Sequence, residues 1–576
     1  MPEGVAWLGE TMEEKPQSAA DRSLQIDRRR ALGLVSLAGA GAAGMAVATA
    51  DLASAAPAPA SQVSTDASTV VETRSGKVGG YRRGGIATFK GIPYAASTAG
   101  QARFLPPQPV AAWTGVRSSR YYGHVCPQPA RTGWDNDMEA FLMRWDDGQP
   151  GEDCLRLNLW TPDPDGMRRP VMVWLHGGGF TAGSGQELPA YDGESLARKG
   201  GLVLVSVNHR LGPLGFLDMS AAGPQFAGSA NIGMLDLVAA LEWVRDNVAA
   251  FGGDPGNVTI FGQSGGGSKV TTLMGMPSAD GLFHKAIVQS GSMKLTATPE
   301  ATRRAFRAVL SEFDFSEATA QRLQLVPAAE LVTRSNRALA IASGPGGPAL
   351  PPGVASRPRL GWSPSVDGKL LPESPFANGA PAMAAKIPMI IGNTKDEWGL
   401  NYARDQADMT HAQLVANLTP IFGDRTDRVI AAFQAEFPGL TPAQAMGTIV
   451  SMPMRNNALD QVEQKHRQGG AAVYSYWFRW ETPILGGMPR AFHCSDLPHC
   501  FANAERCSTT TGDTSEAQEV SNRMSQAWIN FARTGNPSQP GLAWPAYDPA
   551  TVATMVFDTR SRVEHDPASA ARMSVV

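Results

Sequence analysis

Short, nearly continuous runs of apolar and often β-branched residues are the feature that most limits how this chain can fold. Such runs are typical of strands buried on both faces of a sheet. Between two of them, residues 233–251 carry apolar side chains at helical spacing, which predicts an amphipathic helix. Strands that alternate with helices predict an α/β fold with a mainly parallel sheet between layers of helices. The predicted strands of the first half are 171–175, 202–207, 258–261 and 286–288, and the helix presents Met234, Leu237, Val238 and Leu241.

The second half of the chain adds two more predicted strands, at 387–391 and 472–478. Residues 343–361 are dense in proline and glycine, which predicts a surface loop. The stretches 299–339 and 410–465 are helical in pattern but less regular, and we expect them to be insertions that pack around the sheet.

The amino-terminal segment differs in character from the rest. Three consecutive arginines at 28–30 precede a stretch rich in Ala, Gly, Val and Leu, and a small-x-small site ends it near Ala55. This pattern predicts a twin-arginine-type export signal over 1–55, hence export to the periplasm or the medium. A membrane anchor is less favoured, because the stretch is rich in Gly and Ala and interrupted by Asp51. We expect a flexible linker over 56–73 and a single domain over 74–576.

Charge argues against a nucleic acid or an anionic membrane as the main partner. The 576 residues include 50 basic and 53 acidic side chains. Removing residues 1–55 takes away five basic and seven acidic ones, which leaves a net charge of −1 with histidine neutral. A protein of this composition, 43% hydrophobic and 18% charged, is typical of a large soluble globular fold without stable membrane insertion.

The five cysteines lack the spacing of a zinc site, so no metal is expected. In an oxidising compartment Cys126 and Cys154 can close a loop, and we predict a disulfide between them. The pairing of Cys494, Cys500 and Cys507 stays open, with at least one thiol left over.

Ser264 is the candidate nucleophile. The predicted strand 258–261 runs directly into Gly262-Gln263-Ser264-Gly265-Gly266, a G-x-S-x-G pattern between a strand and a predicted helix. A serine on such a sharp turn presents its hydroxyl to a base, and the flanking glycines permit the strained backbone. The pattern alone is weak because glycine and serine are common. Its position after a buried strand gives it weight.

A second glycine motif, His176-Gly177-Gly178-Gly179-Phe180, follows the predicted strand 171–175. Consecutive glycines at a strand end leave amide N–H groups free to bind a substrate oxygen, which is how an oxyanion is stabilised. The plainer interpretation is a flexible turn, but two such motifs in this chain order favour catalysis.

Together these motifs resemble the type-B carboxylesterases, the α/β-hydrolase family that includes the cholinesterases. The resemblance extends over nearly everything after the predicted export signal. Further matching segments are Phe89-Lys90-Gly91-Ile92-Pro93-Tyr94, residues 152–162 (EDCLRLNLWTP), Asn208-His209-Arg210-Leu211-Gly212, residues 251–255 (FGGDP) and Gly535-Asn536-Pro537.

The resemblance also supplies the acid and the base. The family's acidic residue corresponds to Glu397, with its neighbour Asp396 as the weaker alternative. The family's histidine corresponds to His493, and His499 is its rival, at a position where the family usually has an aromatic residue. The order serine, acid, histidine is the one that this fold requires.

The implied reaction is hydrolysis of a small-molecule ester through an acyl-enzyme, without a metal or organic cofactor. The amides of Gly178, Gly179 and Gly265 would hold the oxyanion. Another acyl hydrolase, such as a lipase or an amidase, could use the same machinery. A non-catalytic cholinesterase-like binding module is disfavoured because serine, acid and histidine are all present. The oligomeric state stays open.

Two positions depart from the family. Gln263 stands where a glutamate is usual, and Gly265 stands where an alanine is usual. A missing carboxylate beside the nucleophile predicts preference for uncharged over cationic esters. Among the remaining carboxylates, Asp496 and Glu481 could approach the site in the fold.

Overall fold

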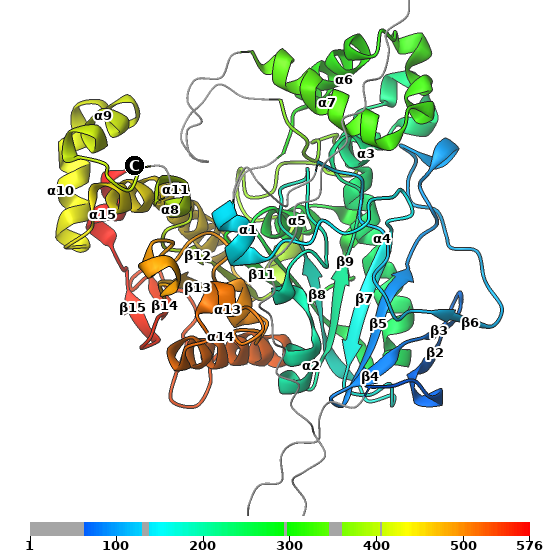
Figure 1. The fold of residues 1–576 in the computed structure, drawn as a ribbon, viewed down its shortest axis with the longest axis horizontal. Helices are drawn as coiled ribbons and strands as arrows, with labels where there is room; N and C mark the ends of the chain where they lie inside the picture. Colours follow the sequence, from blue (N-terminus) through cyan, green and yellow to red (C-terminus); the bar gives the residue numbers. More distant parts are fainter. Residues whose placement is uncertain (1–62, 130–136, 293–295, 345–359, 404–405) are drawn as a thin grey trace, which may run out of the picture. The chain divides into compact units, whose positions relative to one another are not determined.

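The computed structural model describes residues 63–129, 137–292, 296–344, 360–403 and 406–576 (Figure 1). The described residues form one compact unit. The predicted export signal lies outside the described residues, as do most of the predicted loop 343–361 and the first part of the predicted linker.

Twelve strands form one sheet, in the order β1-β4-β5-β7-β9-β8-β10-β11-β12-β13-β14-β15. Neighbours are parallel from β9 to β14 and antiparallel at both ends. All six predicted strands lie in the parallel part, which confirms the α/β fold. The strand bounds are β1 (Val63–Ser64), β4 (Tyr81–Arg83), β5 (Ile86–Pro93), β7 (Arg156–Thr161), β9 (Val203–Val207), β8 (Arg169–Leu175), β10 (Gly253–Gln263), β11 (Lys285–Gln289), β12 (Met389–Thr394), β13 (Val473–Phe478), β14 (Ala553–Phe557) and β15 (Arg562–His565).

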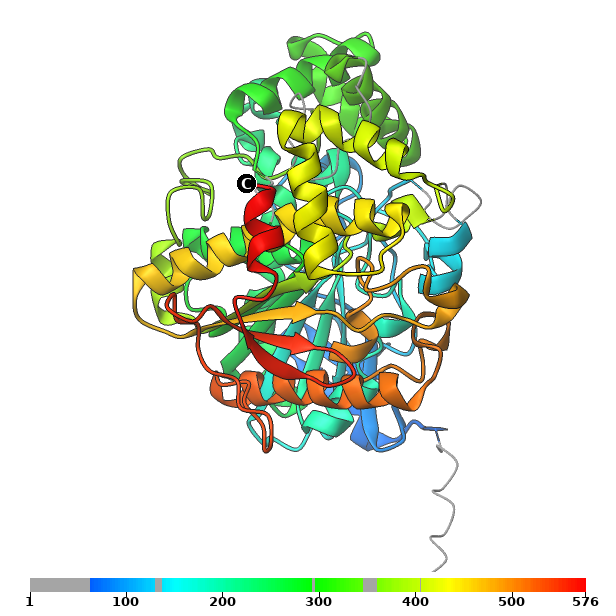
Figure 2. The same cartoon turned by 90° about the vertical axis from the view of Figure 1, so that its left-hand side faces the viewer.

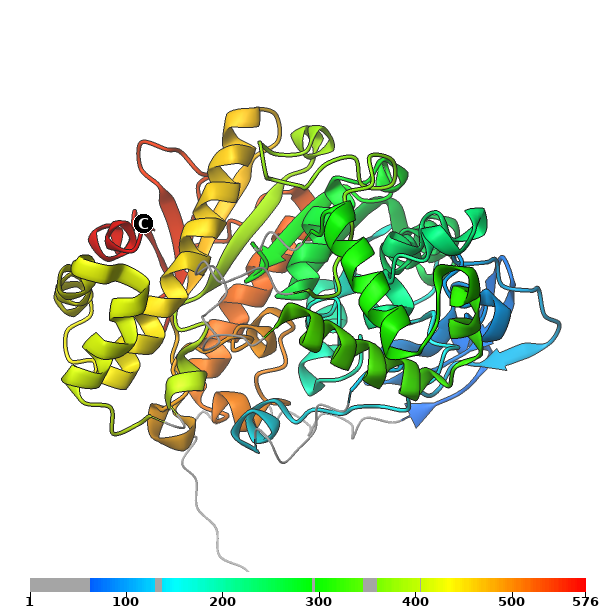
Figure 3. The same ribbon diagram turned by 90° about the horizontal axis from the view of Figure 1, so that it is seen from above.

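Helices cover both faces of this sheet because successive strand residues point to opposite sides. In β8, Val171 and Val173 belong to one apolar core, and Met172 and Trp174 belong to the other. The first core also takes in α4 (Ile232–Asn247), α5 (Gly265–Met274) and part of α11 (Pro442–Gln468); the second takes in α2 (Glu194–Gly200) and α14 (Ser515–Thr534). Figures 2 and 3 show α11 and α14 on opposite sides of the sheet.

The predicted insertions are helical, as expected. The first contains α6 (Pro299–Glu312) and α7 (Ala328–Ser343), which pack together. The second contains α9 (His411–Phe422), α10 (Thr426–Glu436) and α11, and with the carboxyl-terminal α15 (Ser569–Ser574) it has a small core of its own. The shorter helices are α1 (Asp137–Met143), α3 (Gly212–Phe216), α8 (Gly399–Ala403), α12 (Leu497–Cys500) and α13 (Ser508–Thr511).

The linker predicted over 56–73 is wrong for its described part. β1 pairs with β4 at the edge of the large sheet, and β2 (Val70–Thr73) pairs with β3 (Gly76–Gly79) in a second sheet that β6 (Val116–Ser118) completes. Val71 is buried in the main core. The segment 63–73 is therefore part of the folded domain.

The predicted disulfide between Cys126 and Cys154 is also wrong, because both are free thiols. The pKa of Cys154 is well above its usual value; the main cause is a hydrogen bond with Cys126, and the second cause is burial. The Cys126 sulfur accepts the backbone N–H of Leu211 at 3.2 Å. Since the thiolate is the form that exchanges and oxidises, the raised pKa of Cys154 favours a free thiol there rather than a bond to Cys126. No helix among the described residues is long and apolar enough to cross a membrane.

Candidate active site

Ser264 lies on the sharp turn between β10 and α5, at the carboxyl edge of the sheet. Its φ and ψ of 56° and −124° lie where non-glycine residues are rare, and its N–H donates to the carbonyl of Gln289 at 2.8 Å. A Cβ on Gly266 would lie 2.0 Å from the carbonyl oxygen of Leu175, so this turn can be built only with glycine there. The predicted nucleophile is held at the amino end of a helix.

The loop after β8 brings the predicted oxyanion donors against the same turn. Gly178 and Gly179 have φ values of 78° and 62°, which favour glycine. A Cβ on Gly265 would lie 2.4 Å from both N and Cα of Gly179, so the two backbones are in direct contact. Within the described chain, no hydrogen bond uses the amides of Gly178 or Gly179. Three glycines predicted to bind an oxyanion thus meet beside Ser264.

Glu397 and His493 come together from distant parts of the sequence. Glu397 follows β12, is 1% exposed and accepts the N–H of Thr394 through Oε1 at 2.9 Å. Its other oxygen contacts Nδ1 of His493. The segment that carries His493 is tied to the Glu397 loop because Asp396 N–H donates to the carbonyl of Ala491 at 3.0 Å. The predicted acid and the predicted base are in contact.

Asp396, the alternative acid, faces a different set of partners. It is fully buried and accepts hydrogen bonds from Thr448 Oγ1 at 2.6 Å and from Arg490 Nε at 3.2 Å. The two neighbouring side chains point in different directions, so Glu397 contacts the imidazole of His493 and Asp396 contacts the guanidinium of Arg490. The structure therefore supports Glu397 as the choice between the two.

His499, the alternative base, is fully buried among aromatic rings. Its ring centroid lies 5.2 Å from that of Phe478 and 4.9 Å from that of Trp480. Burial lowers the pKa of His499 to about 3. Such an imidazole stays neutral and packs as an aromatic residue, which agrees with the aromatic side chain usual in the family.

His493 has a pKa well above its usual value of 6.5. Burial by itself lowers this pKa, but the neighbouring Cys494 and the Glu397 carboxylate raise it and prevail. The imidazole also stacks on Trp398, with ring centroids 5.1 Å apart and an interplanar angle of 25°. A base must be neutral to accept a proton, so the imidazole becomes competent as the pH rises through its pKa.

Gln263 contacts the imidazole directly. Its Nε2 lies 3.1 Å from Nε2 of His493 and 3.4 Å from Nδ1, and its side chain is almost completely buried. Because Gln263 adjoins Ser264, this contact joins the nucleophile turn to the His493 segment. It also places a neutral amide where the family usually has a carboxylate.

Asp496 and Glu481, the carboxylates that could have stood in for the missing glutamate at position 263, both accept hydrogen bonds from protein groups. Asp496 accepts hydrogen bonds from Gln289 and Tyr476, each at 3.0 Å, and burial raises its pKa to about 6. Glu481 accepts from Lys395 and Arg490, each at 2.7 Å. Glu481 is paired with two cations and Asp496 is completely buried, so neither is available to a cationic substrate.

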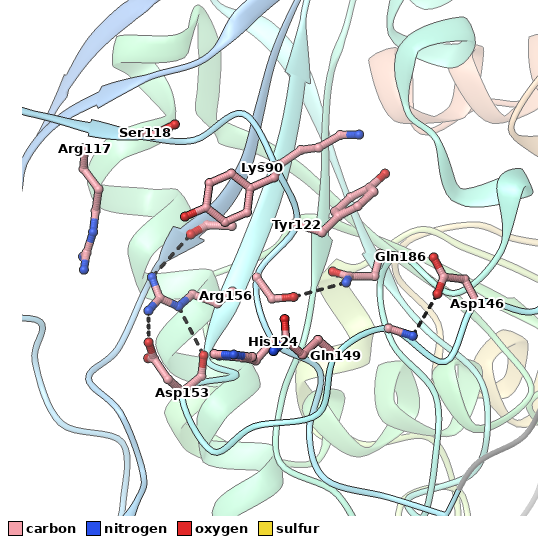
Figure 4. A pocket seen from close by; sticks show the side chains of 14 residues that line it. Lys90, Arg117, Ser118, Tyr122, His124, Asp146, Gln149, Asp153, Arg156 and Gln186 are labelled. Atoms are coloured by element: carbon pink, nitrogen blue, oxygen red, sulfur yellow. Dashed lines mark hydrogen bonds and ion pairs between the residues drawn. The ribbon is translucent and has the colours of Figure 1, made fainter.

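A polar pocket of about 450 Å³ lies beside β5 and β7, and its lining does not include Ser264, Glu397 or His493. Figure 4 shows Arg156 in contact with Asp153. The amide of Gln186, another lining residue, donates to the carbonyl of Gly123 at 3.2 Å. This pocket is separate from Ser264, Glu397 and His493.

Among the described residues, no group of three or more His, Cys, Asp or Glu side chains could hold a metal ion.

Comparison with known proteins decides the family. The family described as "Carboxylesterase family" matches residues 67–573. The chain belongs to the carboxylesterase family. This carboxylesterase is 36% identical to para-nitrobenzyl esterase of Bacillus subtilis over 508 residues, which cover 88% of this chain and 98% of the relative. It is 35% identical to phenmedipham hydrolase of Pseudarthrobacter oxydans over 523 residues, with the same coverage of 88% and 98%.

Among solved structures, an esterase of Clostridium hathewayi that can hydrolyse aliphatic aromatic polyesters superposes on this carboxylesterase with a TM-score of 0.76. The two are 36% identical, and the match covers 90% of this chain and 99% of that one. These likenesses confirm the α/β-hydrolase fold and the resemblance drawn from the motifs.

Two residues that lie beside the site, Trp398 and Lys269, were not identified from the sequence. Trp398 stacks on His493, and the signal for it was an aromatic residue directly after Glu397. Lys269 lies fully buried in α5, and the signal was a lone lysine in an otherwise uncharged stretch after Ser264.

Proposed function

We propose that this carboxylesterase hydrolyses small to medium uncharged esters through an acyl-enzyme on Ser264. The observation that carries the proposal is the contact between Glu397 and His493, joined by Gln263 to the nucleophile turn. A carboxylate on Nδ1 fixes the imidazole tautomer in which Nε2 is the unprotonated nitrogen, the one that can accept a proton.

In the first half of the reaction, Ser264 Oγ attacks the ester carbonyl while its proton passes to His493. The carbonyl oxygen becomes an oxyanion, which accepts hydrogen bonds from the amides of Gly178, Gly179 and Gly265. When the C–O bond to the alcohol breaks, protonated His493 returns the proton to the leaving oxygen. Glu397 stabilises the imidazolium that exists between these two transfers.

In the second half, water replaces the alcohol. His493 takes a proton from water, the hydroxide adds to the acyl carbon, and the bond to Ser264 breaks as the proton returns to its oxygen. The products are the carboxylic acid and free enzyme, and no cofactor takes part.

The preference for uncharged esters follows from the neutral Gln263 side chain beside the nucleophile. Gln263 is neutral, and the nearby carboxylates of Asp496 and Glu481 already accept hydrogen bonds from protein groups. Neither of these two carboxylates is therefore available to a substrate cation near the reacting ester. The relative named for para-nitrobenzyl esters supports an ester without a cationic centre as the substrate class.

A comparison of two esters with the same acyl group tests the proposal. We expect kcat/KM for the neutral p-nitrophenyl or alkyl ester to exceed that for the choline ester by at least about tenfold, roughly 1.4 kcal/mol. Equal or faster hydrolysis of the choline ester would show that a cation site exists. A series of p-nitrophenyl esters of increasing acyl length then defines the size preference.

We also propose export through a twin-arginine-type signal over residues 1–55. The support is the arginine run, the Ala- and Gly-rich stretch and the small-x-small site near Ala55. Fusing 1–55 to a reporter that is active only after export should carry the reporter across the membrane. Replacing Arg28, Arg29 and Arg30 by lysine should stop it, and export by the lysine variant would overturn the assignment.

A further inference from the structure

Lys269 is a completely buried lysine in the second turn of α5, behind the nucleophile. Its Nζ donates to the carbonyl oxygen of His176 at 2.8 Å and lies 3.4 Å from that of Gly177. Removing an amino group from water costs free energy unless its protons find acceptors. Here the acceptors are two carbonyls of the loop that carries the oxyanion donors.

The geometry of the peptide group turns this contact into a constraint on the oxyanion hole. The carbonyl of Gly177 and the N–H of Gly178 belong to one planar trans peptide, so they point in opposite directions. His176 Nδ1 also lies 2.9 Å from the Gly177 oxygen. With that oxygen held on the side of Lys269 and His176, the N–H of Gly178 must face the other way.

The other side of the loop faces the nucleophile turn. A Cβ on Gly177 would lie 3.6 Å from Cβ of Ser264, and one on Gly265 would lie 2.4 Å from N of Gly179. The loop is thus held between Lys269 on one side and the Ser264 turn on the other.

We propose that Lys269 is a positioning residue of the oxyanion hole: its amino group holds the carbonyls of His176 and Gly177, so that the amide of Gly178 faces the reacting ester. The inference rests on the proposed role of Ser264 and extends the machinery beyond the three glycines. A hydrogen bond to a carbonyl also polarises the N–H of the same peptide, which strengthens the bond to an oxyanion.

The positioning does not depend on the charge of Lys269. Burial lowers its pKa to about 7, while the nearby Glu187 acts in the opposite sense. Both the ammonium and the neutral amine donate protons, so the carbonyls stay held on either side of neutrality.

The test is Lys269→Met, assayed with a neutral p-nitrophenyl ester. We expect kcat to fall at least about tenfold with KM little changed, although by less than the 10²–10³-fold that loss of an oxyanion donor itself costs. Affinity for a trifluoromethyl ketone, which forms an oxyanion on the nucleophile, should fall in parallel. The acid limb of the pH profile, which reports His493, should not move.

Lys465 provides a matched control. It is equally buried, and its Nζ donates to the carbonyl of Ala471 at 2.8 Å, near the amino end of β13 and away from the Ser264 edge. Lys465→Met should lose thermal stability as Lys269→Met does but keep kcat for each folded molecule. Lys269→Gln, which retains a donor on a shorter side chain, should show an intermediate kcat and serves if the methionine variant does not fold.

Two results would overturn the role of Lys269: a kcat within twofold of wild type in the folded variants, or a loss matched by Lys465→Met. A change in KM alone would also contradict it. Failure of the proposed function has a different signature, since wild type would then hydrolyse no ester or Ser264→Ala would keep its activity.

Discussion

His493 and His499 lie on the same short segment in opposite surroundings. His493 contacts the Glu397 carboxylate, stacks on Trp398 and has a raised pKa. His499 is enclosed by Phe478 and Trp480, and burial lowers its pKa to about 3. The difference shows that burial alone does not make a histidine a base. A histidine also needs a carboxylate partner and a place at the nucleophile turn, which His493 contacts through Gln263.

Replacing each histidine in turn gives the largest expected contrast. His493→Ala should lower kcat by on the order of 10⁶-fold, as loss of the base does in a well-studied serine hydrolase. His499→Phe should keep kcat and change stability by less than about 1.5 kcal/mol, because it exchanges one ring for another in a packed core. Ester hydrolysis and thermal unfolding measure the two effects. A similar loss of kcat in both variants would contradict the assignment of His493, and not His499, as the base.

The two carboxylates after β12 repeat the contrast on the acid side. Glu397→Gln should lower kcat by about 10⁴-fold, because the imidazole loses the partner that fixes its tautomer. Since Glu397 raises the pKa of His493, the acid limb of the remaining activity should move to lower pH.

Asp396→Asn is the matched control. It weakens the hydrogen bonds to Thr448 and Arg490, so we expect a loss of about 2 kcal/mol in the free energy of unfolding. Its kcat should stay within about tenfold of wild type, a much smaller effect than loss of the triad carboxylate. The reverse ranking of the two variants would assign the imidazole to the other carboxylate.

Gly265→Ala sharpens the comparison by disturbing the oxyanion loop without touching either histidine. It installs the residue usual in the family, yet the new Cβ would lie 2.4 Å from N of Gly179. Displacement of that backbone should lower kcat by about 10²-fold. The acid limb of the pH profile should stay in place, and a shift of that limb would mean that the imidazole had moved instead.

Gln263→Glu should give the smallest effect, on the surroundings of His493 alone. A carboxylate at this contact stabilises the imidazolium and should raise the pKa of the acid limb by about one unit. Because the neutral imidazole is the base, kcat/KM below that pKa should fall about tenfold, and activity should recover at higher pH. Discrimination against choline esters should weaken. An unchanged pH profile would show that Gln263 does not influence the base.

Much of the fold and the site was predictable because the signals are local in sequence. The parallel strands appear as continuous apolar runs, and Ser264, Gly178 and Gly179 stand in glycine motifs directly after two of them. Glu397 and His493 were found through the family resemblance. The structure adds that the two are in contact.

What could not be predicted depends on contacts between distant segments. The short edge strands β1 and β2 have too few residues to show a strand-like pattern of apolar side chains, which is why 63–73 was predicted to belong to a linker. The disulfide was predicted because an exported protein meets an oxidising compartment and because Cys126 and Cys154 could close a loop. Whether the two thiols are bonded depends instead on their hydrogen bonding and burial, which the sequence does not show. Lys269 gives no motif, since its partners are backbone carbonyls of another loop.

Covalent labelling tests the central claim most directly. A fluorophosphonate should modify one serine per molecule, and peptide mass mapping should place the phosphonate on Ser264. Ser264→Ala should keep the fold, take up no label and hydrolyse no ester, because it removes only the hydroxyl at the turn. A label on another residue, or full turnover by Ser264→Ala, would contradict the assignment of the nucleophile and with it the account of the site.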